Sequence, residues 1–243
     1  MNIDDTLKLS LEELGISYSN NQIDTIREFL NIVFNYNKKI NLIGTKDKDG
    51  IFKRHILDSI SILKYKKEFF DNAGEKQKVL DLGTGGGLPG IPLSIFLNES
   101  IFYLLDDSLK KISFLNMVVR ELNLKNIRII KGRAEELGRE SGYRENFNIV
   151  LARAVAKINI LNELAIPFCR INGKIIFYKS RKINVEIKES KESILKLGGK
   201  IDNLFEVKVP YMNEYRVFLV ISKIKESPEI YPRSFNKIKK NPL

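Results

Sequence analysis

The amino-acid sequence predicts an α/β protein whose sheet is mostly parallel, with an antiparallel last strand and a helical N-terminal part. From Lys78 onward, short apolar segments alternate with amphipathic ones, which is the pattern of βαβ units. A glycine-rich turn over residues 83–90 follows the first apolar segment. Only residues 210–214 separate the last two apolar segments, which is short enough for a hairpin.

Three helices are expected before the first strand. Leucines at helical spacing between Leu7 and Leu14 indicate a short one. Ser19 and Gln22 resemble a capping box and precede an apolar stripe, which predicts a longer one. A third is expected over residues 50–65. These helices should form a cap packed against the α/β core.

The remaining elements follow from periodicity and from glycine and proline signals. Seven strands are expected at Val79–Leu82, Phe102–Asp106, Ile127–Ile130, Phe147–Ala152, Lys174–Lys179, Leu204–Val209 and Arg216–Ser222. The helices expected among them are Gly90–Leu97, Lys110–Leu122, Ala134–Gly138, Asn159–Phe168 and Asn184–Leu197.

The predicted organisation has three parts. Residues 1–72 form the cap, residues 73–225 the α/β domain and residues 226–243 a basic tail, and the first boundary falls in the break at residues 71–74. The tail mixes basic and aromatic residues, as RNA-contacting arms often do. Solubilising disorder explains that composition almost as well.

Composition indicates a globular protein with a polyanionic partner. The chain has 243 residues, 43% of them hydrophobic, and a formal charge of +11. Nucleic acid is favoured over an acidic membrane surface, although a biased genome composition also produces many lysines. No membrane span or signal peptide is recognisable, so a cytoplasmic protein is expected. The chain has one cysteine, Cys169, and one histidine, His55, so no metal site is predicted.

The glycine-rich turn predicts a cofactor site. Asp81, Gly83, Gly85 and Gly87 give the pattern D-x-G-x-G-x-G, the usual first motif of S-adenosylmethionine-dependent methyltransferases. The same glycines with Gly90 also satisfy the dinucleotide pattern. A carboxylate at a buried strand end needs a hydrogen-bonding or cationic partner, which favours S-adenosylmethionine. Dinucleotide-binding dehydrogenases, moreover, usually end with a parallel strand.

Several segments together resemble one family, the RsmG or GidB methyltransferases, over nearly the whole chain. Residues 54–59 (RHILDS) and 87–92 (GLPGIP) are the most specific of them. Modest departures are Gly86 in place of a common proline, Ser180 in place of glycine, and a less glycine-rich tail at 234–236. The other resembling segments are 37–42, 81–86, Leu105-Asp106 with Lys110-Lys111, 133–136 and 152–154.

The resemblance implies a class I, Rossmann-like fold that transfers a methyl group from S-adenosylmethionine to guanine N7 in 16S ribosomal RNA, in helix 18 of the decoding region. The substrate would be the RNA within the small subunit or an assembly intermediate, and the protein a monomer. Two alternatives stay open: a noncatalytic ribosome- or RNA-binding module, and a methyltransferase acting on a small molecule or protein.

The resemblance also implies site residues. To the motif it adds Leu88, Ala134, Glu135 and Arg153 as cofactor contacts. Asp106 ends the second strand about 20 residues beyond the glycines, where a carboxylate accepts hydrogen bonds from ribose hydroxyls. Asp107 is its rival, and a helix N-cap is the structural alternative for either.

Four basic residues, Lys110, Arg133, Arg153 and Lys179, would ring the crevice and position RNA phosphates, although each could also be an ordinary solvated charge. No general base is expected, because guanine N7 carries a lone pair and no proton. His55, beside Asp58, is interpreted as a hydrogen-bonded structural residue.

Overall fold

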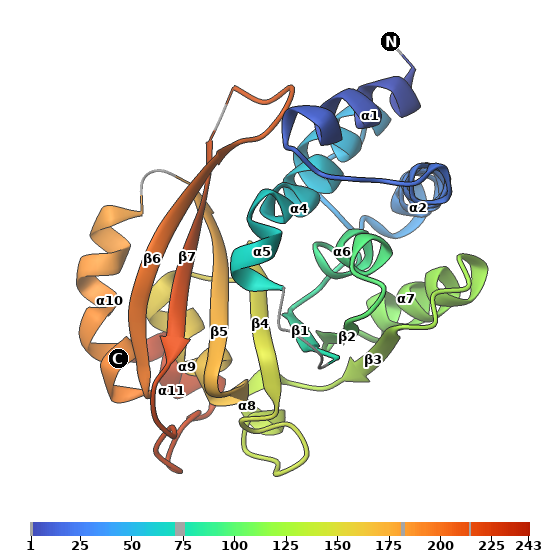
Figure 1. Cartoon of the computed structure of the whole chain (residues 1–243). Coiled ribbons are helices and arrows are strands. Elements are labelled where there is room, and N and C mark those ends of the chain that lie inside the picture. Colours follow the sequence, from blue (N-terminus) through green and yellow to red (C-terminus); the bar gives the residue numbers. More distant parts are fainter. Residues whose placement is uncertain (1, 71–75, 181–182, 214) are drawn as a thin grey trace.

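The computed structural model describes residues 2–70, 76–180, 183–213 and 215–243. A seven-stranded sheet in the order β3-β2-β1-β4-β5-β7-β6 is flanked by helices on both faces (Figure 1). Strands β1 to β5 are parallel, and β7 is antiparallel to both of its neighbours. The predicted α/β class and the antiparallel last strand are confirmed. The strands are β1 (Lys78–Leu82), β2 (Ile101–Asp106), β3 (Ile127–Lys131), β4 (Phe147–Arg153), β5 (Cys169–Ser180), β6 (Gly199–Lys208) and β7 (Tyr215–Lys223).

The strand order reverses beside β1. From β1 the chain proceeds outward to β2 and β3 and then returns to the other side of β1 with β4. Loops that leave neighbouring strands in opposite directions open a crevice at the carboxyl ends of those strands. The turns after β1 and β4 flank this switch point, and the turns after β2 and β3 follow along the same edge of the sheet.

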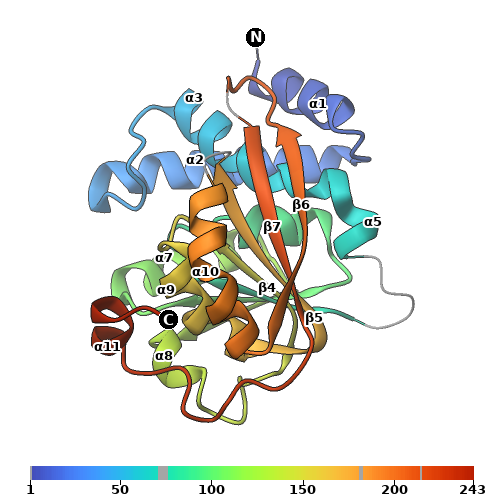
Figure 2. The same ribbon diagram turned by 90° about the vertical axis from the view of Figure 1, so that its left-hand side faces the viewer.

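Each face of the sheet has its own apolar core, because successive strand residues point to opposite sides. Val79 packs with the N-terminal helices, while its neighbour Leu80 packs with the C-terminal ones. Figure 2, turned by 90°, shows α9, α10 and α11 over the second face. The first face is covered by α1 (Ile3–Glu13), α2 (Asn20–Ile40), α6 (Gly90–Phe96) and α7 (Leu109–Glu121), and the second by α8 (Ala134–Leu137), α9 (Ile158–Ala165), α10 (Asn184–Lys196) and α11 (Phe235–Lys240).

The third N-terminal helix differs from the uniform helix expected over residues 50–65. It begins as α3 (Lys48–Ile51) and widens into a π-helical turn, η1 (Phe52–Leu57). It continues as α4 (Asp58–Ile60), tightens into the 3₁₀ turn η2 (Ser61–Tyr65) and ends as α5 (Lys66–Phe69). A π-turn shifts the side chains that follow it around the helix, and such turns are frequent at functional sites.

Two strands begin earlier than the sequence pattern indicates. α9 ends at Ala165, because Pro167 lacks the N–H that would continue it, and β5 starts at Cys169 after a 3₁₀ turn, η3 (Ile166–Phe168). β6, at the edge of the sheet, starts at Gly199. Its first half is largely polar and exposed and so carries no apolar alternation.

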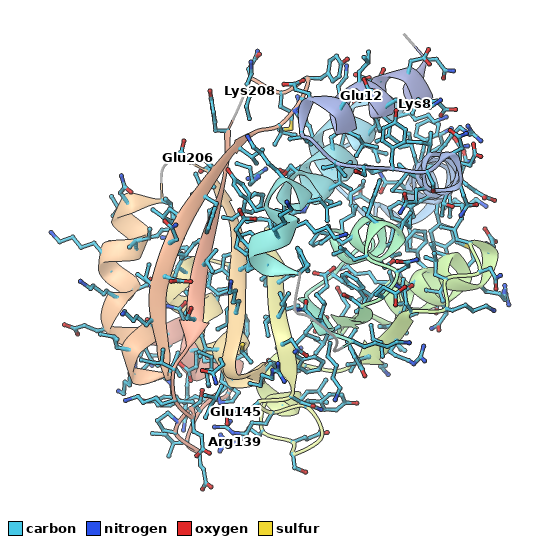
Figure 3. All side chains as sticks on the ribbon, viewed as in Figure 1. Lys8, Glu12, Arg139, Glu145, Glu206 and Lys208 are labelled. Atoms are coloured by element: carbon cyan, nitrogen blue, oxygen red, sulfur yellow. The ribbon has the colours of Figure 1, made fainter. Side chains whose placement is uncertain are left out.

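The C-terminal segment is folded onto the α/β domain. Arg139 and Glu145, labelled in Figure 3, lie where it crosses the carboxyl side of α8. Arg139 Nη1 donates to the carbonyl oxygen of Pro232 at 2.8 Å, and Glu145 Oε1 accepts from the Ser227 N–H at 2.7 Å. Ile238 of α11 is fully buried. The predicted boundary between residues 72 and 73 lies outside the described residues.

Among the residues that the structure describes, no helix has both the length and the apolar character needed to cross a membrane.

Candidate functional site

A cavity of about 350 Å³ lies at the carboxyl ends of the first four strands. That volume is within the range of small-molecule sites. The structure brings five of the predicted residues together here, although they come from three separate turns. They are Gly83 after β1, Asp106 at the end of β2, and Arg133, Ala134 and Glu135 after β3.

The glycine-rich turn has a backbone that side chains would disrupt. Gly83, Gly85 and Gly87 all have φ between +59° and +84°, the left-handed region. A Cβ on Gly87 would lie 2.3 Å from Ile91 Cδ1, and one on Gly90 would lie 2.2 Å from Leu104 Cδ2. Gly85 and Gly87 therefore shape the turn without lining the cavity.

Asp81 braces this turn from beneath. Its Oδ2 accepts hydrogen bonds from Thr84 Oγ1 at 2.6 Å and from the Gly90 N–H at 2.8 Å. Its Oδ1 is buried and has no hydrogen-bond partner within the described residues. Burial raises the pKa of Asp81 to about 6, against the lowering effect of those two hydrogen bonds. Among the described residues none supplies a donor to this oxygen, and Asp81 itself does not line the cavity.

Asp106 and its rival Asp107 have different surroundings. Asp106 is buried, and its oxygens accept from the N–H groups of Gly85 and Ser108, each at 3.0 Å, and from Lys111 Nζ at 3.2 Å. Asp107 has a side chain that is 54% exposed and lies 3.6 Å from Arg133 Nη2. Both line the cavity. Asp106 is thus held by three donors, while the more exposed Asp107 has an ion pair with Arg133.

Of the other predicted cofactor contacts, Ala134 and Glu135 line the cavity and Leu88 does not. Leu88 is buried beneath the turn and donates its N–H to the carbonyl oxygen of Thr84 at 3.0 Å. Ala134 begins α8 at the cavity wall. Glu135 has a side chain that is 12% exposed, and Arg133 Nη1 lies 3.5 Å from its Oε1.

Arg153 lies in a buried ion cluster beside a second cavity. Its Nη1 donates to Asp58 Oδ2 at 2.6 Å, and Arg216 Nε donates to Asp58 Oδ1, also at 2.6 Å. Asp58 is fully buried. The second cavity, of about 310 Å³, is lined by Arg54, His55, Asp58, Ala152, Arg153, Ala154, Ala156, Leu161, Tyr178, Lys179, Ser180 and Arg216.

His55 is locked in one tautomer by this cluster. Arg153 Nη2 lies 2.8 Å from His55 Nδ1, and a guanidinium only donates, so Nδ1 accepts. Nε2 then carries the proton and donates to Thr45 Oγ1 at 2.8 Å. Burial and the neighbouring Arg153 lower the pKa of His55 to about 4. His55 is therefore neutral at physiological pH, as expected of a structural residue.

The four basic residues predicted around the crevice are placed in three different surroundings. Arg133 lines the first cavity with a 53% exposed side chain. Lys179 lines the second cavity, but its Nζ bonds Glu186 Oε2 at 2.9 Å and the Ala156 carbonyl at 3.1 Å. Lys110 lines neither and faces a third, separate cleft.

The two cavities adjoin at Ala154, which lines both and has φ of +56°. A positive φ is costly for alanine and is found where function demands it. Sequence analysis did not assign Asp58, Arg216 or Phe235 to the site, although Phe235 of α11 lines the first cavity. A cation directly before the apolar run at residues 217–221 of β7 was the available signal for Arg216.

Comparison with known proteins agrees with this geometry. The model of the family "rRNA small subunit methyltransferase G" matches residues 22–213. The ribosomal RNA small subunit methyltransferase G of Clostridium tetani is 36% identical over 239 residues, covering 98% of each chain. That of Thermoanaerobacter pseudethanolicus is 36% identical over 232 residues, covering 96% of this chain and 95% of the relative.

Solved structures share the fold of this chain. M. jannaschii TYW2 in complex with AdoMet superposes with a TM-score of 0.50 at 20% identity, over 67% of this chain and 76% of that one. Aeropyrum pernix fibrillarin with natively bound S-adenosyl-L-methionine gives 0.50 at 17% identity, over 64% and 70%. With the family match over most of its length, the chain belongs to the small-subunit ribosomal RNA methyltransferase G family.

Proposed function

We propose that this protein transfers a methyl group from S-adenosylmethionine to N7 of a guanosine in helix 18 of the 16S ribosomal RNA decoding region. We also propose that it acts as a monomer in the cytoplasm, on the small subunit or an assembly intermediate. The observation that carries the proposal is the junction at Ala154 between two cavities of different chemistry. One is the crevice between the turns after β1, β2 and β3, and the other is rich in arginine.

The first cavity suits S-adenosylmethionine. The unpaired Oδ1 of Asp81 would receive the ammonium of the methionine part, directly or through water. A Cβ on Gly83 would lie 3.0 Å from Val155, so glycine keeps the entrance open. An ionised carboxylate has about four acceptor sites. Asp106 uses three of them, two on Oδ2 and one on Oδ1, so it retains a site on Oδ1 for a ribose hydroxyl, which Ala134 and Glu135 would flank.

The second cavity suits a nucleotide of RNA. Arg54, Arg153, Lys179 and Arg216 line it, and Asp58 is the one carboxylate among its lining residues. Arg54 is exposed and forms no ion pair within the described part of the chain. An excess of cations favours a phosphate-bearing group, and Ala154 would bring its base beside the first cavity.

The chemistry then requires positioning and no proton transfer. S-adenosylmethionine supplies, when bound, an electrophilic methyl group on a sulfonium. Guanine N7 presents an in-plane lone pair, so the residues around Ala154 need to align it with that methyl and exclude water. His55 cannot serve as a base, because Arg153 occupies its acceptor nitrogen. With N7 facing the methyl, guanine would be recognised at its Watson–Crick edge, on a base turned out of its helix.

The decisive experiment maps 7-methylguanosine in 16S ribosomal RNA from cells with and without the gene. We expect one guanosine in helix 18 to lose its methyl group and to regain it when purified protein and S-adenosylmethionine are added. Methylation at another atom or in another RNA would refute the assignment.

Cofactor binding separates this proposal from its alternatives. We expect calorimetry to show binding of S-adenosylhomocysteine and none of NAD. Tight NAD binding would support the dinucleotide interpretation of the glycine pattern. RNA binding with no affinity for S-adenosylhomocysteine would support a noncatalytic RNA-binding module.

A further inference from the structure

A third cleft, of about 690 Å³, lies outside both cavities of the proposed site. Its walls are the end of α2, the loop that follows, and the first turn of α7. We name it the lysine cleft. It is lined by Asn37, Lys38, Lys39, Ile40, Asn41, Lys46 and Lys110, with no carboxylate among them.

The lysines of this cleft are uncompensated. Within residues that the structure describes, none of the four forms an ion pair, and Lys38 Nζ instead lies 4.0 Å from the centre of the Phe34 ring. Lys39, Lys46 and Lys110 are exposed. Like charges gathered on one concave surface repel one another, and a bound polyanion removes that cost.

Interaction with a helix dipole explains the placement of only two of the four lysines in the lysine cleft. Lys38 and Lys39 lie in the last turn of α2, where cations interact favourably with the helix dipole. Lys110 lies in the first turn of α7, which contains no acidic residue and where the dipole disfavours a cation. Lys46 lies on a loop. Their placement is accounted for by a ligand that carries negative charge.

The cleft is built rather than incidental. Asn37 is buried, donates from Nδ2 to the Thr45 carbonyl at 2.8 Å and accepts the Ile43 N–H on Oδ1 at 2.9 Å. Asn41 ends α2 in the left-handed region, with φ of 49°. These bonds fold the loop back on α2 and bring Lys46 to the same cleft as Lys38 and Lys39.

The same loop packs against the glycine-rich turn and against the wall of the second cavity. A Cβ on Gly86 of the glycine-rich turn would lie 3.5 Å from Ile43 Cγ2, and Thr45 holds His55 beside the second cavity. We propose that the lysine cleft binds the phosphodiester backbone of the substrate RNA, flanking the nucleotide that enters the second cavity. This inference rests on the proposed RNA substrate and adds a site on the far side of the loop.

The test uses the full-length protein with unmodified 16S ribosomal RNA, comparing Lys46→Gln/Lys110→Gln with the control Lys188→Gln/Lys191→Gln on α10. Both variants lose two exposed lysines, and the control pair lies on the opposite face of the sheet. We expect the first variant to lose RNA affinity on the order of tenfold at low salt. The slope of log affinity against log salt should become less steep by about 1.4 to 1.8. Each of the two lost phosphate contacts contributes roughly 0.7 to 0.9 to that slope. The control should keep the wild-type slope.

Lysine acetylation of the wild-type protein provides a second measurement that does not depend on a variant. RNA should protect Lys46 and Lys110 and leave Lys188 and Lys191 reactive. Equal losses in both variants, or an unchanged slope with no protection, would overturn the inference while leaving the methyl-transfer proposal intact. Loss of S-adenosylhomocysteine affinity in the first variant would assign the cleft to the cofactor instead. Wild-type protein that neither binds nor methylates the RNA would refute both.

Discussion

At the residue scale, keeping the buried Asp81 carboxylate ionised costs free energy that the proposed cofactor would offset. Its pKa rises from 3.8 to about 6, so keeping it ionised at pH 7 costs the cofactor-free protein about 3 kcal/mol. The folded state binds the extra proton between pH 3.8 and 6, and this contribution to stability is lost as pH rises through 6. A cationic ligand group at Oδ1 would offset that cost.

Asp81→Asn should therefore separate stability from binding. Its amide oxygen can still accept from Thr84 and Gly90, and no charge is buried. We expect urea unfolding to show a variant at least as stable as wild type at pH 7, with S-adenosylhomocysteine affinity reduced tenfold or more by calorimetry. In the wild type that affinity should rise with pH and level off above about 6. A variant that is less stable but binds normally would make Asp81 purely structural.

Asp106 and Asp107 form a matched pair for testing the ribose contact. Asp106→Ala should weaken cofactor binding by the loss of charge-assisted hydrogen bonds, each about 1.5–3 kcal/mol. The exposed Asp107→Ala serves as the control and should bind almost normally. Calorimetry with S-adenosylhomocysteine measures both. The opposite ranking would transfer the role to Asp107.

The rate of methyl transfer should not depend on the titration of His55. With a pKa of about 4, lowered mainly by burial, it stays neutral from pH 6.5 to 8.5. We expect a nearly flat single-turnover rate of methyl transfer across this range. His55→Gln, whose amide can still accept from Arg153 and donate to Thr45, should keep much of that rate. A steep rise near pH 6.5 that the substitution abolishes would show participation in the reaction.

At the element scale, the sequence predicted best the strands that are buried on both faces and therefore form short continuous apolar runs. β1 and β2 are almost wholly buried, and their observed bounds differ from the expected ones by a single residue. The third N-terminal helix was not predictable in detail, because its change to π-geometry has no counterpart in apolar spacing. The contact of Asp58 with Arg216 joins residues 158 positions apart, which no local pattern reveals.

Asp58 fastens that irregular helix to the sheet, so its loss should be costly. Asp58→Asn leaves Arg153 and Arg216, whose side chains are 10% and 20% exposed, without the buried carboxylate that pairs with both. We expect a loss of about 3 kcal/mol in the free energy of unfolding, measured with urea. Asp49→Asn is the control, because that carboxylate is 67% exposed, pairs with Lys53 and should change stability by at most about 0.5 kcal/mol.

At the scale of the whole molecule, the C-terminal segment belongs to the folded body and reaches the proposed site. Its basic and aromatic composition allowed either an RNA-contacting arm or disorder. Neither alternative anticipated that Tyr231 and Ile238 are buried or that Phe235 lines the cofactor cavity. Glu163 anchors the segment to α9. Its side chain is fully buried, and its Oε2 lies 2.6 Å from Arg233 Nη2.

Two variants should separate docking of this segment from its contribution to the site. Arg233→Met leaves the Glu163 carboxylate buried and unpaired, so we expect unfolding to become easier by about 3 kcal/mol, with most of that loss recovered in Glu163→Gln/Arg233→Met. Phe235→Ala removes part of the cavity wall and should lower S-adenosylhomocysteine affinity more than it lowers stability. Urea unfolding and calorimetry measure the two effects. If Phe235→Ala binds S-adenosylhomocysteine like wild type, Phe235 does not contribute to the cofactor site. If the double variant stays as unstable as Arg233→Met, the unpaired Glu163 carboxylate is not the cause of the lost stability.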